Sequence, residues 1–439
     1  MRSWRAKPRI IEQGAATRGA LTMAQLSDDC FAFGGKLMSV DDAMMMIGSR
    51  IGAVPESEML PLMDCDGRVL TRPLIAPAPL PLFTNSAVDG YAVRSADLAQ
   101  GVSSALAIGG RVQAGSRADP IAPSTAVRIF TGAPMPPGAD TVFMQEDVTL
   151  ESSGRVSLPA GLKPGANVRP AGEDISLGAT ALSAGRRLRP QDLALAAALG
   201  VTRLEISRRI RVAVFSTGNE VVQPGAARHE AQLFDSNRFM LMALLRRLGC
   251  EVSDLGILRD DRASLSEALR AAARAHDLVL TSGGVSTGEE DHVRSAVEAI
   301  GSLVLWRMAI KPGRPVAMGV VEGAPFIGLP GNPVASFVTF AYVVRPVVLA
   351  LAGASPEPLI PLPVRAAFSY RKKKGRREYV RAHLRLAADH VREAVKFPRE
   401  GAGLLSSLVE TDGLVELGED VERVEPGETV GFLAYPVLL

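Results

Sequence analysis

The chain has 439 residues, of which 47% are hydrophobic and 22% charged, as expected for a globular protein of roughly three ordinary domains. Its 49 basic and 47 acidic residues leave a net charge of +2, which gives no reason to expect nucleic acid or a membrane as a partner. Cys30, Cys65 and Cys250 lie far apart, which excludes a zinc ribbon and favours a reducing, cytoplasmic setting.

The first third of the chain predicts an extension, a helix and a β-rich unit. Residues 1–38 begin with a basic stretch that lacks an apolar core, so they are an N-terminal extension rather than a secretory signal. Ser39 to Leu62 predicts a helix, because apolar residues recur at helical spacing. The proline-rich stretch 73–81 predicts an extended linker. Short apolar runs between glycine and proline turns then predict β structure to about Gly161.

The remaining chain predicts an α/β domain followed by a small β domain. Leu188 to Gly200 predicts a helix with Pro190 in its first turn. Residues 211–352 alternate between strand-like and helical patterns, which indicates a parallel sheet covered on both faces. Within this region, Phe337 to Leu351 is the most apolar run, and its Arg345 favours a buried helix over a membrane span. The last ~80 residues predict a barrel or sandwich of short strands.

Two glycine-rich loops follow predicted strands of the α/β domain. The first spans residues 215–220 and the second spans residues 281–291, which contain Gly283, Gly284, Ser286 and Gly288. Backbone N–H groups at strand ends and helix starts favour a phosphate. The plain alternative is that these glycines only form turns.

Acidic and basic residues beside these loops suggest a cation site and an anion site. Glu220, Asp260 and Asp291 are oxygen ligands of the kind that Mg²⁺ prefers, although such acids more often cap helices. Lys311 and Arg314 flank a Pro-Gly turn and could hold an oxyanion, or they could be solvated.

Three further segments have ambiguous interpretations. The loop 329–337, with Gly331 and Asn332, is either a helix start or another anion site. The basic run 371–377 is most simply a solvated hairpin tip, although a weak nucleic-acid signal and a phosphate-bearing ligand are both compatible with it. Spacing alone assigns no role to the polar residues in segments 85–93, 128–140 and 167–175, which are Asp89, Thr131, Arg169 and Asp174.

Taken together, these segments resemble the molybdopterin molybdenumtransferase family of the MoeA type. The matching stretches, which run in family order from Ser39 to the C-terminus, are NSAVDGYAV, RIFTGAPMPPGADTVFMQED, NVRPAGEDISLG, VFSTGNEVV, FDSNRFMLMALLRRLGCEV, LTSGGVSTGEEDHV, AIKPGRPVAMG and GLPGNPVASFVTF. The resemblance implies an elongated multidomain α/β plus β chain with a central three-layer α/β domain. It implies domain I at 39–82 and 168–208, an inserted β-rich domain II at 83–167, domain III at 209–356, and a β-barrel-like domain IV at 357–439.

The resemblance also implies a reaction and its partners. Adenylylated molybdopterin and molybdate are the expected substrates, and AMP is released with Mg²⁺ as cofactor. A homodimer is expected, with the active cleft between the α/β domain of one subunit and the second and fourth domains of its partner. The adenylylating enzyme and a molybdoenzyme or chaperone acceptor are the other expected partners.

Residue roles follow from the family's motifs. Glu220, Asp260 and Asp291 would hold Mg²⁺, and Lys311 with Arg381 would hold molybdate. The glycine loop at Gly283 would hold the pterin and its phosphate. The other substrate-binding positions are Arg307, Arg314, Gly331 and Asn332, and the group that would close the cleft is Asp89, Thr131, Arg169 and Asp174. The chain departs from the family pattern at Asn219, Arg307 and Ala402, where aspartate, lysine and serine are common.

Two alternatives share parts of this pattern. A molybdopterin adenylyltransferase has the same α/β domain and glycine loop, but the N-terminal NSAVDGYAV block and the fourth domain argue against it. A non-catalytic scaffold of the same family would need an appended module that this sequence lacks.

Overall fold

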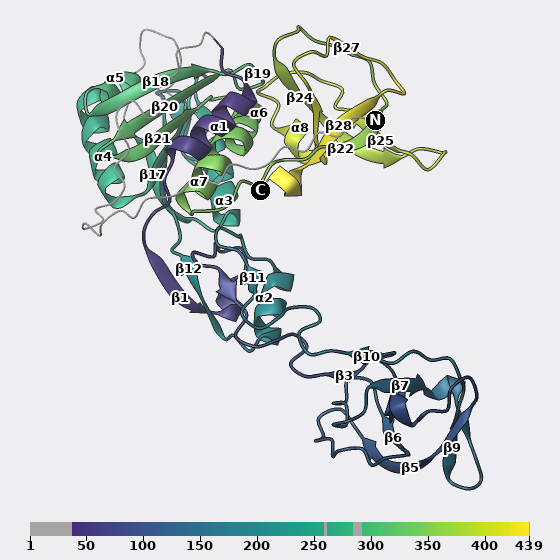
Figure 1. The fold of residues 1–439 in the computed structure, drawn as a ribbon. Helices are drawn as coiled ribbons and strands as arrows, with labels where there is room; N and C mark the ends of the chain where they lie inside the picture. Colours follow the sequence, from purple (N-terminus) through teal and green to yellow (C-terminus); the bar gives the residue numbers. More distant parts are fainter. Residues whose placement is uncertain (1–36, 259–260, 284–291, 439) are drawn as a thin grey trace, which may run out of the picture. The chain divides into compact units, whose positions relative to one another are not determined.

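The computed structural model describes residues 37–258, 261–283 and 292–438 (Figure 1). The chain forms two compact units. One contains residues 57–208, and the other contains residues up to 56 together with 209–439. The second of these holds both the α/β domain and a C-terminal barrel.

The α/β domain is built on a six-stranded sheet in the order β16-β13-β17-β21-β20-β18. Neighbours among β16, β13, β17 and β21 pair in parallel, and β20 runs antiparallel to both of its neighbours. Every residue of β17 and β21 is buried, as expected for strands covered on both faces. The bounds are β13 Arg211–Thr217, β16 Glu251–Leu258, β17 Leu278–Ser282, β18 Gly301–Arg307, β20 Pro315–Val321 and β21 Ala324–Leu329.

Helices cover both faces of this sheet and give it two cores. Helix α4 (Arg262–Ala275) begins at Asp261, whose side chain accepts from Ser264 N–H, and packs with α5 (His292–Glu298) on one face. Helices α1 (Val40–Arg50) and α3 (Asn237–Arg247) contribute to the larger core on the other face. The domain therefore has three layers, α/β/α.

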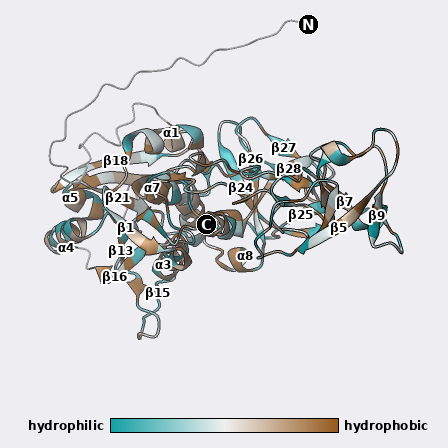
Figure 2. Ribbon diagram, turned by 60° about the horizontal axis from the view of Figure 1, so that its bottom comes forward, coloured by the Kyte–Doolittle hydropathy of each residue, from teal (hydrophilic) through white to brown (hydrophobic). Residues whose placement is uncertain are grey.

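One long helical stretch lies in the larger core. It consists of α6 (Pro333–Thr339), a π-helical turn at Phe340–Val344 and α7 (Arg345–Leu351). Among the helices that the structure describes, this stretch alone is long and apolar enough to cross a membrane, and 89% of its apolar window is buried inside the protein. Its hydrophobic colouring is visible along α7 in Figure 2. The prediction of a buried helix here is confirmed.

The C-terminal barrel closes on itself. Its strands follow the order β24-β25-β22-β28-β26, and β26 pairs with β24 to complete the ring. Inward side chains such as Val380, Val415 and Phe432 form its core. The bounds are β22 Leu362–Ala366, β24 Arg377–Leu386, β25 Arg392–Lys396, β26 Gly413–Leu417 and β28 Thr429–Ala434, with a side pair of β23 Tyr370–Arg371 and β27 Arg423–Val424 and the short helix α8 Ser406–Val409.

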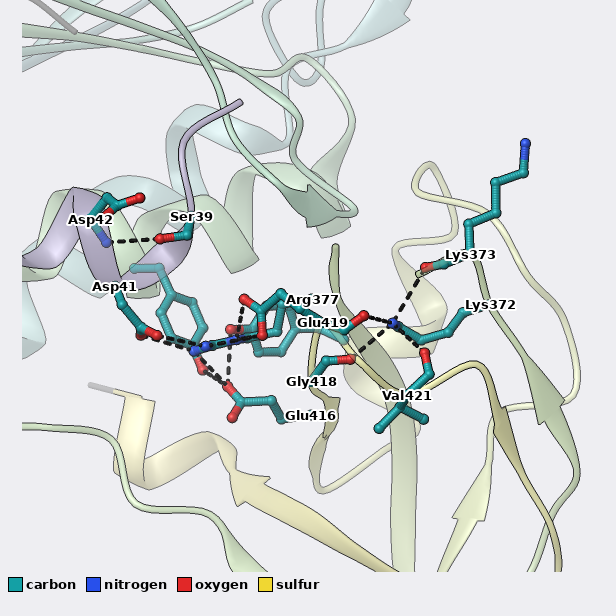
Figure 3. A network of polar contacts seen from close by, with 12 residues as sticks. Ser39, Asp41, Asp42, Lys372, Lys373, Arg377, Glu416, Gly418, Glu419 and Val421 are labelled. Atoms are coloured by element: carbon teal, nitrogen blue, oxygen red, sulfur yellow. Dashed lines mark hydrogen bonds and ion pairs between the residues drawn. The ribbon is translucent and has the colours of Figure 1, made fainter. Parts of the chain in front are cut away.

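The barrel is fixed to the α/β domain by backbone and charged contacts. Strand β19 (Ile310–Lys311) pairs in parallel with the start of β24. Beside it, Arg377 Nη2 lies 3.0 Å from Asp41 Oδ2 and Arg377 Nε lies 3.1 Å from Glu419 Oε1 (Figure 3). The neighbouring Glu416 accepts from the hydroxyls of Tyr342 and Tyr379 at 3.0 Å each. These bonds join α1, the long helix and the barrel.

The unit 57–208 contains two β modules, the first antiparallel and the second a mixed sheet in which β5 and β6 pair in parallel. In the first, β1 (Ser57–Pro61) pairs with β12 (Arg203–Ser207), and β2 (Leu74–Ile75) pairs with β11 (Thr180–Leu182) beside α2 (Pro190–Ala198). The second is a six-stranded sheet in the order β7-β4-β6-β5-β9-β8. Its bounds are β4 Gly90–Val93, β5 Ser104–Val112, β6 Thr125–Ile129, β7 Thr141–Met144, β8 Thr149–Leu150 and β9 Arg155–Leu158.

The predicted multidomain α/β plus β class is confirmed, and two local predictions are wrong. The helix predicted for residues 39–62 ends at Arg50, because Gly52 and Pro55 interrupt it and β1 follows. The basic run 371–377 is not simply a solvated tip. Lys372 is buried and donates to the carbonyls of Gly418 and Val421 (Figure 3).

Candidate functional site

Three parallel strands of the α/β domain end at one edge of the sheet and are followed by glycine loops. Strand β13 is followed by Gly218, β17 by Gly283 and β21 by Pro330 and Gly331. The Gly283 N–H donates to the Leu329 carbonyl at 3.0 Å. Gly283 has a φ of +89°, and a Cβ there would lie 3.3 Å from the Thr217 carbonyl oxygen. Glycine is therefore needed for this close approach of the two loops.

Asn237, the first residue of α3, ties two of these loops together. Its Nδ2 donates to Ser282 Oγ at 2.9 Å and to the Gly331 carbonyl at 2.7 Å. The side chain is 7% exposed, so both bonds are shielded from water. Asn237 was not predicted from the sequence, because a polar residue at a helix start is typical of a cap.

Several buried polar atoms at this edge lack a partner. Across the described parts of the chain, Ser216 Oγ, Thr217 Oγ1, Thr281 Oγ1 and Asn237 Oδ1 make no hydrogen bond. A buried polar group without a partner is costly, so such groups usually meet a ligand or an ordered water. Their position at the carboxyl ends of parallel strands is where ligands bind in open α/β sheets.

Glu220 lies exposed just after β13, close against its own loop. A Cβ at Gly218 would lie 2.6 Å from Glu220 Oε2, and Gly218 has a φ of +128°. Nothing among the described residues pairs with the Glu220 carboxylate. The other two predicted metal ligands, Asp260 and Asp291, lie outside the described residues, as do Gly284, Ser286 and Gly288. Within the described ranges no group of three His, Cys, Asp or Glu side chains could hold a metal.

A cavity of about 330 Å³ opens between the α/β domain and the barrel. One wall comes from the loop after β19, the residues that lead into α6, and α6 itself. The opposite wall comes from β24, β25 and the segment after β25. Its charged lining residues are Lys311, Glu378, Arg381, Lys396, Arg399 and Glu400.

A buried carboxylate anchors one side of this cavity. Glu378 is 1% exposed, and its Oε2 accepts from Lys311 Nζ at 3.1 Å and from the Tyr370 hydroxyl at 2.8 Å. Arg376 Nε donates to its other oxygen at 2.6 Å. Burial, together with the hydrogen bond to Glu378, raises the pKa of Tyr370 well above its usual range, so the hydroxyl stays a donor.

Arg381 stands on the other side without an acidic partner. It is 8% exposed, and its guanidinium donates only to neutral oxygens, Ser407 Oγ at 3.1 Å and the Gly401 carbonyl at 3.0 Å. Burial lowers the pKa of Arg381. No carboxylate among the described residues bonds directly to Arg381, and the exposed Glu400 is the acid whose charge acts on it from a distance, so its buried charge can still attract an anion. The cavity is thus suited to a small oxyanion.

The structure brings some of the predicted residues together here and leaves others apart. Lys311, Asn332 and Arg381 line the same cavity, and Ala402 also lines it. Arg307 and Arg314 are exposed and are absent from its lining, so their binding role stays a prediction. Both walls of this cavity come from one chain, and the expected cleft with a partner's second and fourth domains stays a prediction. Lys396, Arg399 and Glu400 were missed, because only the folded barrel places them here.

Of the four residues in the unit 57–208 that were predicted to close the cleft, Asp89 and Thr131 bond to each other. Asp89 Oδ1 accepts from both the N–H and the hydroxyl of Thr131 at 2.8 Å each, and these bonds lower the pKa of Asp89. Arg169 lies on β10 (Val168–Arg169), which pairs with β3 (Asn85–Ser86). Asp174 is exposed, and its N–H donates to the Leu80 carbonyl at 3.0 Å.

Comparisons with known proteins cover nearly all of the chain. Residues 38–200 match the MoeA N-terminal region (domains I and II), 213–350 match a probable molybdopterin-binding domain, and 363–435 match the MoeA C-terminal region (domain IV). The chain is 38% identical to the molybdopterin molybdenumtransferase of Haemophilus influenzae, over 90% of this chain and 98% of that protein. It is 33% identical to the enzyme of that name from Nostoc, over 88% and 91%.

A solved structure has the same fold. The molybdopterin biosynthesis MoeA protein of Pyrococcus horikoshii OT3 superposes with a TM-score of 0.76 at 27% identity, over 91% of this chain and all of that one. The matched regions and the names of these relatives place the chain in a class of transferases of molybdenum cofactor biosynthesis. The chain belongs to the MoeA family of molybdopterin molybdenumtransferases.

Proposed function

We propose that this transferase takes adenylylated molybdopterin and molybdate and releases AMP as molybdenum enters the dithiolene. The observation that carries the oxyanion part of the proposal is the buried Arg381, which has only neutral partners and faces a cavity that also holds Lys311. Molybdate is a dianion, so charge-assisted hydrogen bonds from Lys311 and Arg381 would bind it strongly.

The edge of the α/β sheet is the proposed site of the pterin and its phosphates. Backbone N–H groups of the glycine loops would hold phosphate oxygens. Asn237 would keep the two loops at the spacing the substrate requires.

A magnesium ion is the proposed cofactor at this edge. The exposed carboxylate of Glu220 fits it, and Asp260 and Asp291 would complete the ligand set. When bound, the ion would neutralise charge on the phosphate linkage between the pterin and AMP.

The remaining partners are also proposals. The Asp89–Thr131 pair, with Arg169 and Asp174, would close the cleft of a second subunit in a cytoplasmic homodimer. An adenylylating enzyme would supply the substrate, and a molybdoenzyme or its chaperone would accept the product.

One assay tests the proposed reaction. Purified chain is incubated with adenylylated molybdopterin, Mg²⁺ and molybdate, and AMP release is measured together with reconstitution of a cofactor-free molybdoenzyme. We expect AMP and active cofactor to appear together and Glu220→Ala to slow both. Adenylylation of molybdopterin from ATP by the chain alone, without molybdenum insertion, would instead show an adenylyltransferase.

A further inference from the structure

The cavity carries a second lysine beside Lys311. Lys396 Nζ lies 5.4 Å from the centre of the Tyr370 ring, and Lys311 Nζ lies 5.8 Å from the same point. Cation–π attraction therefore keeps both ammonium groups near one ring that lines the cavity. Lys396 is thus placed where an oxyanion held by Lys311 would also meet it.

The two acids of the cavity differ in how firmly they are held. Glu378 is buried and accepts hydrogen bonds from Lys311, Tyr370 and Arg376. Moving its carboxylate would therefore break three hydrogen bonds and leave their donors without an acceptor. Glu400 has a side chain that is 60% exposed, and Lys396 at 2.9 Å is its single donor among the described residues. Breaking such an exposed ion pair costs little, because water solvates the released carboxylate.

The charge of the cavity depends on Glu400. Its lining includes the cations Lys311, Arg381, Lys396 and Arg399 and the acids Glu378 and Glu400. While Glu400 faces Lys396, it offsets a cation that an incoming anion could otherwise use. The hydrogen bond from Lys396 also lowers the pKa of Glu400, so the carboxylate stays charged at neutral pH.

We propose that Glu400 competes with the oxyanion for Lys396. The Glu400 carboxylate pairs with Lys396 until the anion displaces it, and Lys396 then becomes a third cationic ligand of the anion. This inference rests on the proposed oxyanion site and adds to it a residue that sets the affinity. Glu400 itself makes no contact with the bound anion. It acts chiefly through its hydrogen bond with Lys396, and its charge also attracts Lys311 and Arg381 from a distance.

Direct binding of molybdate to the full-length chain, measured by isothermal titration calorimetry, tests this competition. Glu400→Gln removes the competing charge and should bind molybdate about twofold to fivefold more tightly. Lys396→Met removes a charge-assisted donor and should bind about tenfold more weakly or worse. In the Lys396→Met background, Glu400→Gln should tighten binding much less than it does in the unaltered chain, because the cation that bonds directly to Glu400 is gone and only its longer-range attraction to Lys311 and Arg381 remains.

Asp389→Asn is the matched control. It makes the same acid-to-amide change in an exposed ion pair of the barrel, with Arg365, and does not line the cavity. It should bind molybdate as the unaltered chain does. If Glu400→Gln also binds like the unaltered chain, or if it tightens binding by the same factor in the Lys396→Met background, the competition for Lys396 is refuted.

Arg381→Ala separates this inference from the proposed site. If it loses molybdate binding while Glu400→Gln changes nothing, the oxyanion site stands and only the competitor role fails. If Arg381→Ala binds as well as the unaltered chain, the site itself is wrong and the competitor role falls with it.

Discussion

Single buried polar side chains organise both candidate sites. Arg381 presents its charge to the barrel cavity because its hydrogen bonds go to neutral oxygens, those of Ser407 and Gly401. Asn237 uses both N–H bonds of one amide to join the loops after β17 and β21. Each side chain thus links the fold to the ligand that we propose.

Replacing Asn237 should weaken the pterin site more than the fold. Asn237→Ala leaves Ser282 Oγ and the Gly331 carbonyl without their partner, at a cost of about 1–3 kcal/mol of stability. The loops then lose their fixed spacing, so the KM for adenylylated molybdopterin should rise several-fold. Steady-state kinetics and urea unfolding measure the two effects.

A control for lost stability is available in the same helix. Leu245→Ala removes fully buried apolar surface from α3 and should cost about 2–5 kcal/mol without touching either loop. Its KM should stay unchanged. A KM that rises equally in both variants would mean that Asn237 acts through general stability, and its positioning role would be lost.

The elements differ in how clearly their sequences define them. Strands β13, β16, β17 and β18 follow the predicted pattern, because an apolar run beside an amphipathic helix is a strong local signal, whereas β20 and β21 were not predicted as strands. The predicted helix at 39–62 failed, because its apolar spacing persists past Gly52 while the backbone does not remain helical. The cavity residues Lys396 and Glu400 could not be predicted, since their role arises only where the barrel meets the α/β domain.

Asp192 in helix α2 should make the stability of the fold depend on pH in the acidic range. Asp192 is buried, which opposes its ionisation, but hydrogen bonds from Arg186 and Arg189 outweigh burial and lower its pKa to about 2. Because the folded pKa lies below the usual 3.8, ionised Asp192 stabilises the fold above pH 4, and this contribution is lost as the pH falls towards 2. Its size at neutral pH is about 2 kcal/mol.

Asp192→Asn tests this pH dependence. At pH 7 the free energy of unfolding of the variant should be about 2 kcal/mol lower than that of the unaltered chain. This difference should shrink between pH 4 and pH 2. Circular dichroism during urea unfolding at several pH values would follow it. A difference that stays constant across this range would show that ionisation of Asp192 does not contribute.

At the scale of the larger unit, the barrel and the α/β domain form one cavity, so their contact matters for function. Arg377 joins Asp41 of α1 to Glu419 of the barrel (Figure 3). Arg377→Ala leaves these acids and Glu416 without their shared cation and should cost about 3 kcal/mol. Molybdate affinity should fall with it, although Arg377 does not line the cavity.

Calorimetric unfolding and molybdate titration of the same variant measure this coupling. Arg423→Ala is the control, because it removes an exposed arginine that pairs within the barrel with Glu425. It should change stability by less than about 1 kcal/mol and leave affinity intact. An Arg377→Ala variant that behaves like this control would show that the domain contact does not support the cavity.

The most direct test is a crystal structure of the chain soaked with tungstate, located by its anomalous scattering. The oxyanion should lie within hydrogen-bond reach of both Arg381 and Lys311, in the cavity between β24 and the loop after β19. An anion bound elsewhere, with Arg381 still bonded only to Ser407 and Gly401, would contradict the assignment of this cavity to the incoming metal.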